Sequence, residues 1–223
     1  MSWQHPVPPI TDAERLERLA RLRERIDAEG LAGLLLGPSE SLRYFTGLVW
    51  HASERFLGAL VTPAGLFYIV PGFERSRVET LPHLAADILE WQEEESSAAL
   101  VAGLLGEKGV LALDDAMPLH FYNALARALG AGRLRDGGPL VNGLRRIKSV
   151  NEIALIQYAM NLTMDVHRQV HAMLKPGMLA SDVVRFIDQR HRAAARPSAS
   201  SPSAGRHRCR MGRTATRGSA RTT

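Results

Sequence analysis

The spacing of apolar residues predicts an alternation of helices and strands over residues 12 to 142. From residue 12 to Gly30, apolar residues recur every three or four positions and arginine and glutamate fill the positions between them. That period is typical of an exterior amphipathic helix, and Thr11 with Glu14 forms the spacing of a capping box at its start. Residues 31–36 are a short, wholly apolar run, which predicts a strand buried on both faces.

A hairpin follows in the middle of this region. Two apolar runs, residues 56–62 and 66–70, are joined by Pro63-Ala64-Gly65, which has the composition of a tight turn between antiparallel strands. The other elements expected from the pattern are helices over 74–81, 97–105 and 117–129 and strands over 87–91, 110–113 and 134–136. The sequence therefore predicts an α/β domain whose mixed β-sheet is flanked by helices.

The pattern changes after residue 143. The glycine-rich segment 137–143 reads as a linker, and Ser149 with Glu152 then forms a second capping box. An apolar stripe predicts a long helix from Val150 to Leu174, which the segment Lys175-Pro176-Gly177 should end. A further helix is expected to begin near Ser181.

The net charge of +5 in 223 residues is concentrated at the C-terminus. Residues 193–223 contain seven arginines and no acidic residue, while the rest of the chain is slightly acidic. A basic tail of this kind gives no sequence-specific nucleic-acid recognition, so we expect no specific nucleic-acid partner. There is no apolar run long enough to span a membrane, no secretory signal and only one cysteine, Cys209, so the expected location is cytoplasmic with no membrane association.

Two sets of residues in the body could carry chemistry. His167 and His171 have the i, i+4 spacing by which two imidazoles share a metal, but they lack an intervening glutamate and a third ligand, so an exposed helix face is the favoured interpretation. Asp114 and Asp115 follow a predicted strand, where catalytic carboxylates often lie. Capping of the following helix is the favoured interpretation for this pair.

Several motifs resemble one family. They are Tyr44-Phe45-Thr46-Gly47, Glu54-Arg55, Arg146-Ile147-Lys148-Ser149 and Lys175-Pro176-Gly177-Met178. With the long capped helix, they resemble the Xaa-Pro peptidases, the family of prolidase, aminopeptidase P and creatinase. The resemblance implies a creatinase/prolidase-like N-terminal domain over 9–142 and, over 143–192, two helices that begin a truncated pita-bread (α+β) metallopeptidase domain.

The resemblance also implies a function for an intact relative. Such a relative would be a homodimer that hydrolyses proline-containing peptides before proline, with two divalent metals (manganese, cobalt or zinc) held by two aspartates, a histidine and two glutamates. Those ligands would have to follow residue 192, but the last carboxylate of this chain is Asp188. We therefore expect no catalytic residue, no metal ligand and no cofactor in this chain, and no hydrolysis by it; a non-catalytic peptide- or protein-binding module is the alternative.

One loop remains a candidate for contact with substrate. In the resembled family, the N-terminal domain of one subunit borders the active site of its dimer mate. The loop that precedes the hairpin carries an aromatic residue, a histidine and two charged residues, and these are the substrate-proximal candidates: Trp50, His51, Glu54 and Arg55.

The segment 193–223 has the composition of a disordered basic tail. Read one base out of frame, the codons of residues 207–212 permit Ser-Leu-Pro-His-Gly, and those of 197–204 permit a strand-like apolar run. In the resembled family, a strand followed by a Pro-His-Gly segment comes after the second helix. We therefore hypothesise that the tail is a frameshifted reading of a catalytic domain.

Overall fold

The computed structural model describes residues 7–195, so the predicted tail lies almost wholly outside the described residues. The chain divides into two compact units, one ending at Ala159 and the other beginning at Met160. Among the described residues, no helix is both long enough and apolar enough to cross a membrane.

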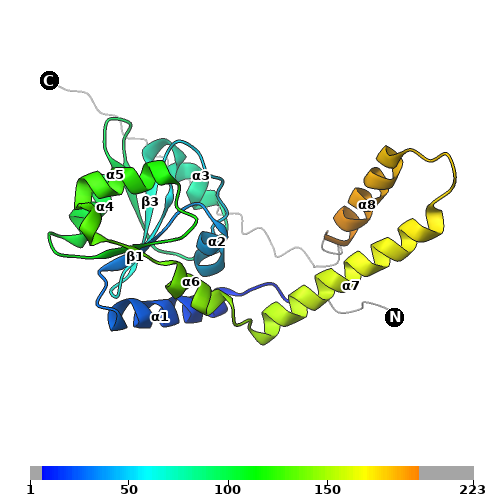
Figure 1. Ribbon diagram of the computed structural model, residues 1–223, viewed down its shortest axis with the longest axis horizontal. Coiled ribbons are helices and arrows are strands. Elements are labelled where there is room, and N and C mark those ends of the chain that lie inside the picture. Colours follow the sequence, from blue (N-terminus) through cyan, green and yellow to red (C-terminus); the bar gives the residue numbers. More distant parts are fainter. Residues whose placement is uncertain (1–6, 196–223) are drawn as a thin grey trace, which may run out of the picture. The chain divides into compact units, whose positions relative to one another are not determined.

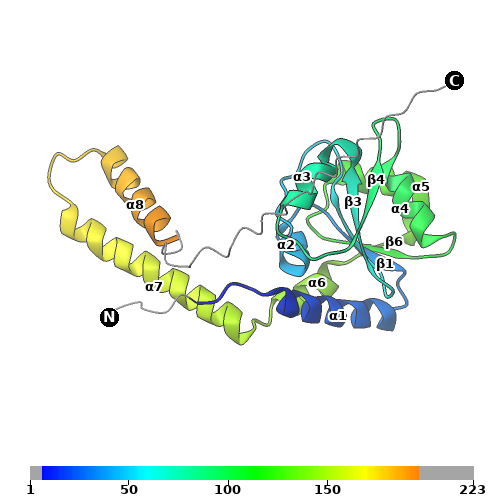
Figure 2. The same cartoon turned by 180° about the vertical axis from the view of Figure 1, so that it is seen from behind.

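The first unit is built on a six-stranded mixed sheet (Figures 1 and 2). The strand order across the sheet is β4-β3-β2-β1-β5-β6. The strands are β1 (Gly33–Leu36), β2 (Gly58–Val61), β3 (Leu66–Pro71), β4 (Asp87–Trp91), β5 (Leu111–Leu113) and β6 (Leu134–Asp136). Only β2 is antiparallel to its neighbours, so the other five strands run in one direction. The predicted mixed sheet and its hairpin are confirmed.

Helices cover both faces of the sheet. The helices of this unit are α1 (Asp12–Ala28), α2 (Glu40–Thr46), α3 (Arg75–Thr80), α4 (Ser97–Leu105), α5 (Leu119–Leu129) and α6 (Gly138–Arg145). One apolar core lies between the sheet and α1, α2, α3 and α6, and a second lies between the opposite face and α4 and α5. Figure 1 shows α4 and α5 side by side, and Figure 2 gives the view from behind.

Strand β1 shows why this arrangement follows from the sequence. Leu34 and Leu36 point into the first core, whereas Leu35 points into the second, and each is at most 1% exposed. Burial of a leucine side chain contributes about 1.5–3 kcal/mol, so an uninterrupted apolar run is favoured only where both faces are covered. The prediction of a fully buried strand is confirmed.

Two helices differ from the expectation. Residues 137–143 do not form an extended linker, because α6 begins at Gly138 and buries Leu140 and Val141 in the first core. Its glycines suggested a loop, but Pro139 in the first turn is compatible with a helix start. Helix α2 was not predicted, although Ser39 caps it and Gly47 ends it at φ +83°, a left-handed conformation that glycine adopts without strain.

The long helix α7 (Val150–Met173) begins where the sequence predicted and ends one residue earlier. Its capping box is present: the Glu152 amide donates to Ser149 Oγ at 3.1 Å, and the Ser149 amide donates to a Glu152 carboxylate oxygen at 2.8 Å. Gly177 adopts a φ of +86° in the turn that follows, and α8 (Ala180–Ala195) begins one residue before the expected position.

Candidate functional site

The carboxyl ends of five strands lie at the same end of the sheet, which we call its carboxyl edge. Because β2 runs in the opposite direction, its amino end, and the loop of residues 47–57 that enters it, lie at this same edge. Open α/β sheets bind ligands outside the carboxyl ends of their strands, where loops rather than core side chains meet. The predicted substrate-proximal loop therefore lies at the edge of the sheet where a ligand site is expected.

A cavity of about 270 Å³ opens at this edge, and we call it the Trp50 cavity. Its lining comes from the loop before β2, from the end of β3 and the short 3-10 helix Gly72–Glu74 that follows it, and from the turn after β4: Trp50, Ser53, Glu54, Arg55, Leu57, Pro71, Phe73, Glu74 and Glu93. Trp50, Glu54 and Arg55 are thus brought together at one cavity. His51 is exposed and does not line it.

Two arginines stack on the aromatic rings of the Trp50 cavity. The guanidinium carbon of Arg55 lies 4.9 Å from the centre of the Phe73 ring, and that of Arg77 lies 4.7 Å from the Trp50 ring. Arg55 Nη1 also pairs with Glu93 at 2.5 Å, and Arg77 Nη1 with Glu74 at 3.8 Å. Each guanidinium is therefore shared between an aromatic face and a carboxylate.

The base of the loop is anchored in the sheet. The indole nitrogen of Trp91, the last residue of β4, donates to the Phe56 carbonyl at 3.1 Å, and both side chains are buried. Within the loop, the Arg55 amide donates to Ser53 Oγ at 3.3 Å and closes a turn. These bonds hold the loop against the end of β4, where Glu93 contributes to the same cavity.

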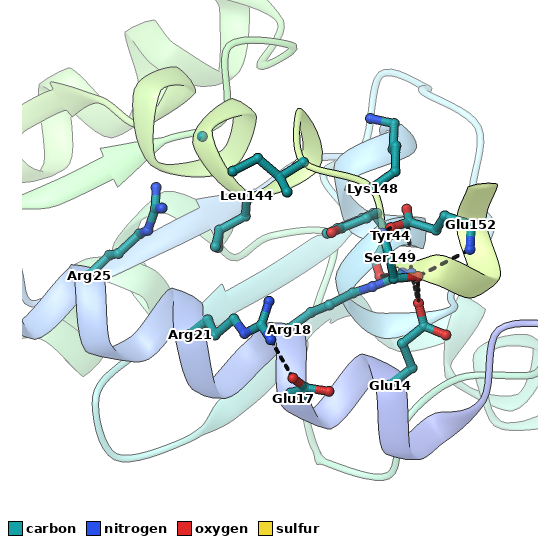
Figure 3. A pocket seen from close by; sticks show the side chains of 12 residues that line it. Glu14, Glu17, Arg18, Arg21, Arg25, Tyr44, Leu144, Lys148, Ser149 and Glu152 are labelled. Atoms are coloured by element: carbon teal, nitrogen blue, oxygen red, sulfur yellow. Dashed lines mark hydrogen bonds and ion pairs between the residues drawn. The ribbon is translucent and has the colours of Figure 1, made fainter.

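A second polar site lies where α7 begins, and we call it the Glu14 cluster: Glu14, Arg18, Tyr44, Ser149 and Glu152. One Glu14 oxygen accepts from Arg18 Nη2 at 2.6 Å and from Ser149 Oγ at 2.8 Å. Arg18 also donates to the Tyr44 carbonyl at 2.9 Å and lies 4.0 Å above the Tyr44 ring. Arg18 Nη2 also forms an ion pair with a Glu152 carboxylate oxygen at 3.5 Å. Figure 3 shows these side chains converging from α1, α2 and the start of α7.

Opposing effects set the pKa of Glu14. Burial by itself would raise the pKa of this carboxyl, but hydrogen bonds from Ser149, Asn151 and Arg18, with the charge of Arg18, hold it below its ordinary value. The predicted capping box at α1 is therefore only half correct. The Glu14 amide does bond to Thr11 Oγ1 at 3.2 Å, but the Glu14 carboxylate is engaged by α7 instead of the cap.

An open cavity of about 310 Å³ borders the Glu14 cluster. Arg21, Arg25, Leu144 and Lys148 line it together with the cluster, and Figure 3 labels these side chains around the opening. Arg21 is neutralised by Glu17, with which it forms an ion pair. Since the carboxylates of the cluster are already engaged by Arg18 and Ser149, the cluster's evident role is to join the start of α7 to α1 and α2.

Asp114 is a buried carboxylate directly after β5, at the carboxyl edge of the sheet, and it does not cap a helix. It accepts hydrogen bonds from Ser39 Oγ at 2.6 Å and Ser41 Oγ at 3.2 Å, so it ties the end of β5 to the start of α2. Helix α5 starts after Pro118 without a side-chain cap, so the capping interpretation is wrong for both aspartates. Asp115 instead accepts a hydrogen bond from Asn142 Nδ2 at 2.9 Å. Burial raises the pKa of Asp114, and the neighbouring charge of Asp115 adds to that shift.

The histidine pair on α7 is exposed at both positions, His167 and His171, as the helix-face interpretation predicted. Within residues 7–195, no three or more histidine, cysteine, aspartate or glutamate side chains are grouped so that they could hold a metal ion. The described residues therefore do not fit a two-metal centre, and we assign no ligand to them.

Comparison with known protein families gives a match over most of the first unit. Residues 18–147 match the Creatinase/Prolidase N-terminal domain. Among curated proteins, the chain is 31% identical to the probable dipeptidase PepE of Mycobacterium tuberculosis, over 79% of this chain and 48% of that protein. An uncharacterised peptidase of Schizosaccharomyces pombe is 26% identical over 82% of this chain and 45% of its own length. The chain thus spans about half the length of the curated relatives it matches.

Solved structures give the same picture. Dipeptidase PepE from Mycobacterium ulcerans superposes with a TM-score of 0.73 at 26% identity, covering 82% of this chain and 51% of that one. A prolidase from Thermococcus sibiricus superposes with a TM-score of 0.70 at 19% identity, over 84% of this chain and 51% of the prolidase, and supports the fold alone.

Proposed function

The chain belongs to the creatinase/prolidase family through its N-terminal domain, and from that membership we propose that it is part of an Xaa-Pro dipeptidase or aminopeptidase. The observation that carries the proposal is the match of residues 18–147, together with relatives named as dipeptidases. Residues 9–142 are then the N-terminal domain, and 143–192 begin the metallopeptidase domain.

The proposed reaction belongs to the complete enzyme. A dimetal centre, when bound, would supply the nucleophile that cleaves the peptide bond before proline. This chain's last carboxylate is Asp188, and hard divalent metals require oxygen ligands of that kind. The 223-residue polypeptide on its own is accordingly proposed to be inactive.

An activity assay tests the inactivity. The purified chain is incubated with Ala-Pro and Gly-Pro and with added manganese or cobalt, and release of free proline is measured. We expect no release above the metal-only control. Metal-dependent turnover that co-purifies with this polypeptide through successive columns would contradict the proposal.

The role proposed for the Trp50 loop is contact with the peptide substrate. Its support is the position of Trp50, Glu54 and Arg55 around one cavity at the carboxyl edge of the sheet. In a homodimer of the family type, the N-terminal domain would border the active site of the partner subunit, and the Trp50 loop is the part of it that we propose to lie there. His51, which is exposed beside the cavity, is the fourth residue proposed to lie near substrate.

The same cavity supports a second candidate, a non-catalytic module that binds peptides or proteins. A related fold can be kept for binding alone. The two candidates differ in what the gene encodes beyond the present reading frame. A downstream frame that encodes two aspartates, a histidine and two glutamates in family order supports the peptidase, and the lack of any such frame supports the binding module.

A further inference from the structure

The Trp50 cavity has an excess of negative charge at its rim. Glu54, Glu74 and Glu93 all line it, whereas Arg55 is the one basic residue in its lining. Arg55 is paired with Glu93, and Arg77, just outside, is paired with Glu74. Among residues 7–195, no basic side chain forms an ion pair with Glu54, which is exposed.

The aromatic rings of the cavity already contact positively charged side chains of this chain. Both aromatic rings, Trp50 and Phe73, carry a guanidinium group within 5 Å of their centres. Phe73 is nevertheless 58% exposed, so much of its surface stays open to a ligand. A ring face is electron-rich and attracts a cation, most strongly where a carboxylate lies nearby. The aromatic rings and the carboxylates of the cavity therefore both favour a positively charged ligand.

We propose that the Trp50 cavity is a specificity subsite for a positively charged group of a peptide, bound between the Glu54 carboxylate and the open face of Phe73. The proposal rests on the proposed function, because it assumes that peptides reach this edge of the sheet. The ligand chemistry is an alkylammonium or guanidinium group, which a peptide supplies as a lysine or arginine side chain or as its α-amino group.

The size of the cavity limits what it can hold. Its volume of about 270 Å³ is slightly below the roughly 300–1,000 Å³ of common ligand sites. One side chain or one chain terminus fits, whereas a whole peptide does not. The cavity therefore selects by charge at one position of the peptide and leaves the remainder to other surfaces.

A matched pair of peptides tests the charge. Acetyl-Arg-Pro-amide and acetyl-citrulline-Pro-amide have nearly the same shape and differ in the positive charge. Each is titrated into the full 223-residue chain, and binding is followed by the indole N–H signals in two-dimensional NMR, with Trp50→Phe used to assign the Trp50 signal. We expect the arginine peptide to bind about five-fold more tightly, in keeping with exposed ion pairs and cation–π contacts. Equal affinities would overturn the proposal.

A second pair of peptides identifies the source of the cation. Ala-Pro-amide with a free amino group is compared with acetyl-Ala-Pro-amide. A preference for the free amine that exceeds the arginine preference assigns the subsite to the α-amino group, and the opposite order assigns it to a basic side chain. If neither cation improves binding, no source remains and the proposal fails.

Two glutamates of the same region provide matched variants. Glu54 lines the cavity, whereas Glu94 is exposed one residue beyond Glu93 and does not line it. We expect Glu54→Gln to abolish the preference for the arginine peptide and Glu94→Gln to retain it, with both variants folded by circular dichroism. An equal loss in both variants would show only a general charge effect and overturn the subsite.

The outcome also separates this proposal from the proposed function. If neutral and charged peptides bind equally and shift the Trp50 signal, the loop still contacts peptide and only the charge selection fails. If no peptide binds at millimolar concentration, the subsite and the placing of substrate at this loop both fail. The peptidase assignment is then decided separately, by the reading frame and the activity assay.

Discussion

Ser149 and Glu14, which are 135 positions apart in the sequence, are joined by a hydrogen bond of 2.8 Å from the serine hydroxyl to the carboxylate. The same hydroxyl accepts the Glu152 amide and caps α7. One side chain therefore starts the long helix and attaches it to α1.

Replacement of Ser149 by alanine removes both interactions. A lost N-cap costs about 1 kcal/mol, and a lost hydrogen bond to a charged group about 1.5–3 kcal/mol, with partial compensation by water at this half-buried position. We expect Ser149→Ala to lower the free energy of unfolding by about 2 kcal/mol in urea titrations. Ser149→Thr, which keeps the hydroxyl, is the control and should lose much less.

Glu14 makes the first unit sensitive to acid. Its pKa in the folded state is lowered from 4.5, so its interactions stabilise the fold above that value and are lost as the pH falls through the lowered pKa. We expect the stability of the wild-type chain to decline below about pH 4.5 and that of Glu14→Gln to decline less over the same range. Parallel curves of unfolding free energy against pH for the two proteins would exclude Glu14 as a source of this decline.

Asp114 has the opposite pH dependence. Its pKa is raised by burial, so its contribution is present below its ordinary value of 3.8 and is lost as the pH rises through the raised pKa. Asparagine keeps one oxygen for the serine hydroxyls and removes the charge. The stability of Asp114→Asn relative to wild type should therefore increase between pH 4 and pH 7, as measured by urea unfolding at each pH. A difference that does not change with pH would contradict this reasoning.

Gly47 ends α2 in a left-handed backbone conformation that is strained for residues with a side chain. At φ +83°, and with Arg15 Nε 3.0 Å from the position of an added Cβ, Gly47→Ala should cost about 1–2 kcal/mol. Gly103 lies inside α4, and apart from its chain neighbours and the backbone of α4 itself no atom lies within 4 Å of an added Cβ, so Gly103→Ala should stabilise by about 0.5–1 kcal/mol. Thermal unfolding of both variants checks the contrast, and a loss of similar size at both positions would refute it.

The hypothesis that 193–223 is a frameshifted reading is tested on the gene. Resequencing around codons 190 to 197 should reveal a one- or two-base change that opens a longer frame with two aspartates, a histidine and two glutamates. If the sequence stands and no such frame follows, the binding-module alternative takes the place of the peptidase.

The sequence predicted those features that depend on neighbouring residues. The box of Ser149 and Glu152 fixed the start of α7 to the residue, and the apolar run before Gly37 identified the central strand. The features it did not predict depend on distant partners. Nothing near Glu14 indicates that its carboxylate bonds to Ser149, and nothing near Asp114 indicates that Ser39 and Ser41 enclose it.

In the candidate site, too, the sequence indicated the local part and not the part that depends on distant residues. The loop pattern of Trp50, Glu54 and Arg55 drew attention to one segment. Phe73 and Glu93, which complete the cavity, come from the segments that follow β3 and β4 and become neighbours only when the sheet forms. Helix α6 was missed for a local reason, because three glycines within seven residues outweighed the buried pair Leu140 and Val141.

The Glu14 cluster sets the shortest polypeptide in which the N-terminal domain keeps all its polar partners. A chain ended at residue 142 would retain Glu14 and Arg18 on α1 but lose Ser149, Asn151 and Glu152. The buried Arg18 and the half-buried Glu14 would then keep only each other and Tyr44 as partners. We therefore expect the autonomous folding unit to extend through the first turns of α7, as does the compact unit that ends at Ala159. In a chimaera of two related proteins, α1 and the start of α7 should therefore come from the same parent.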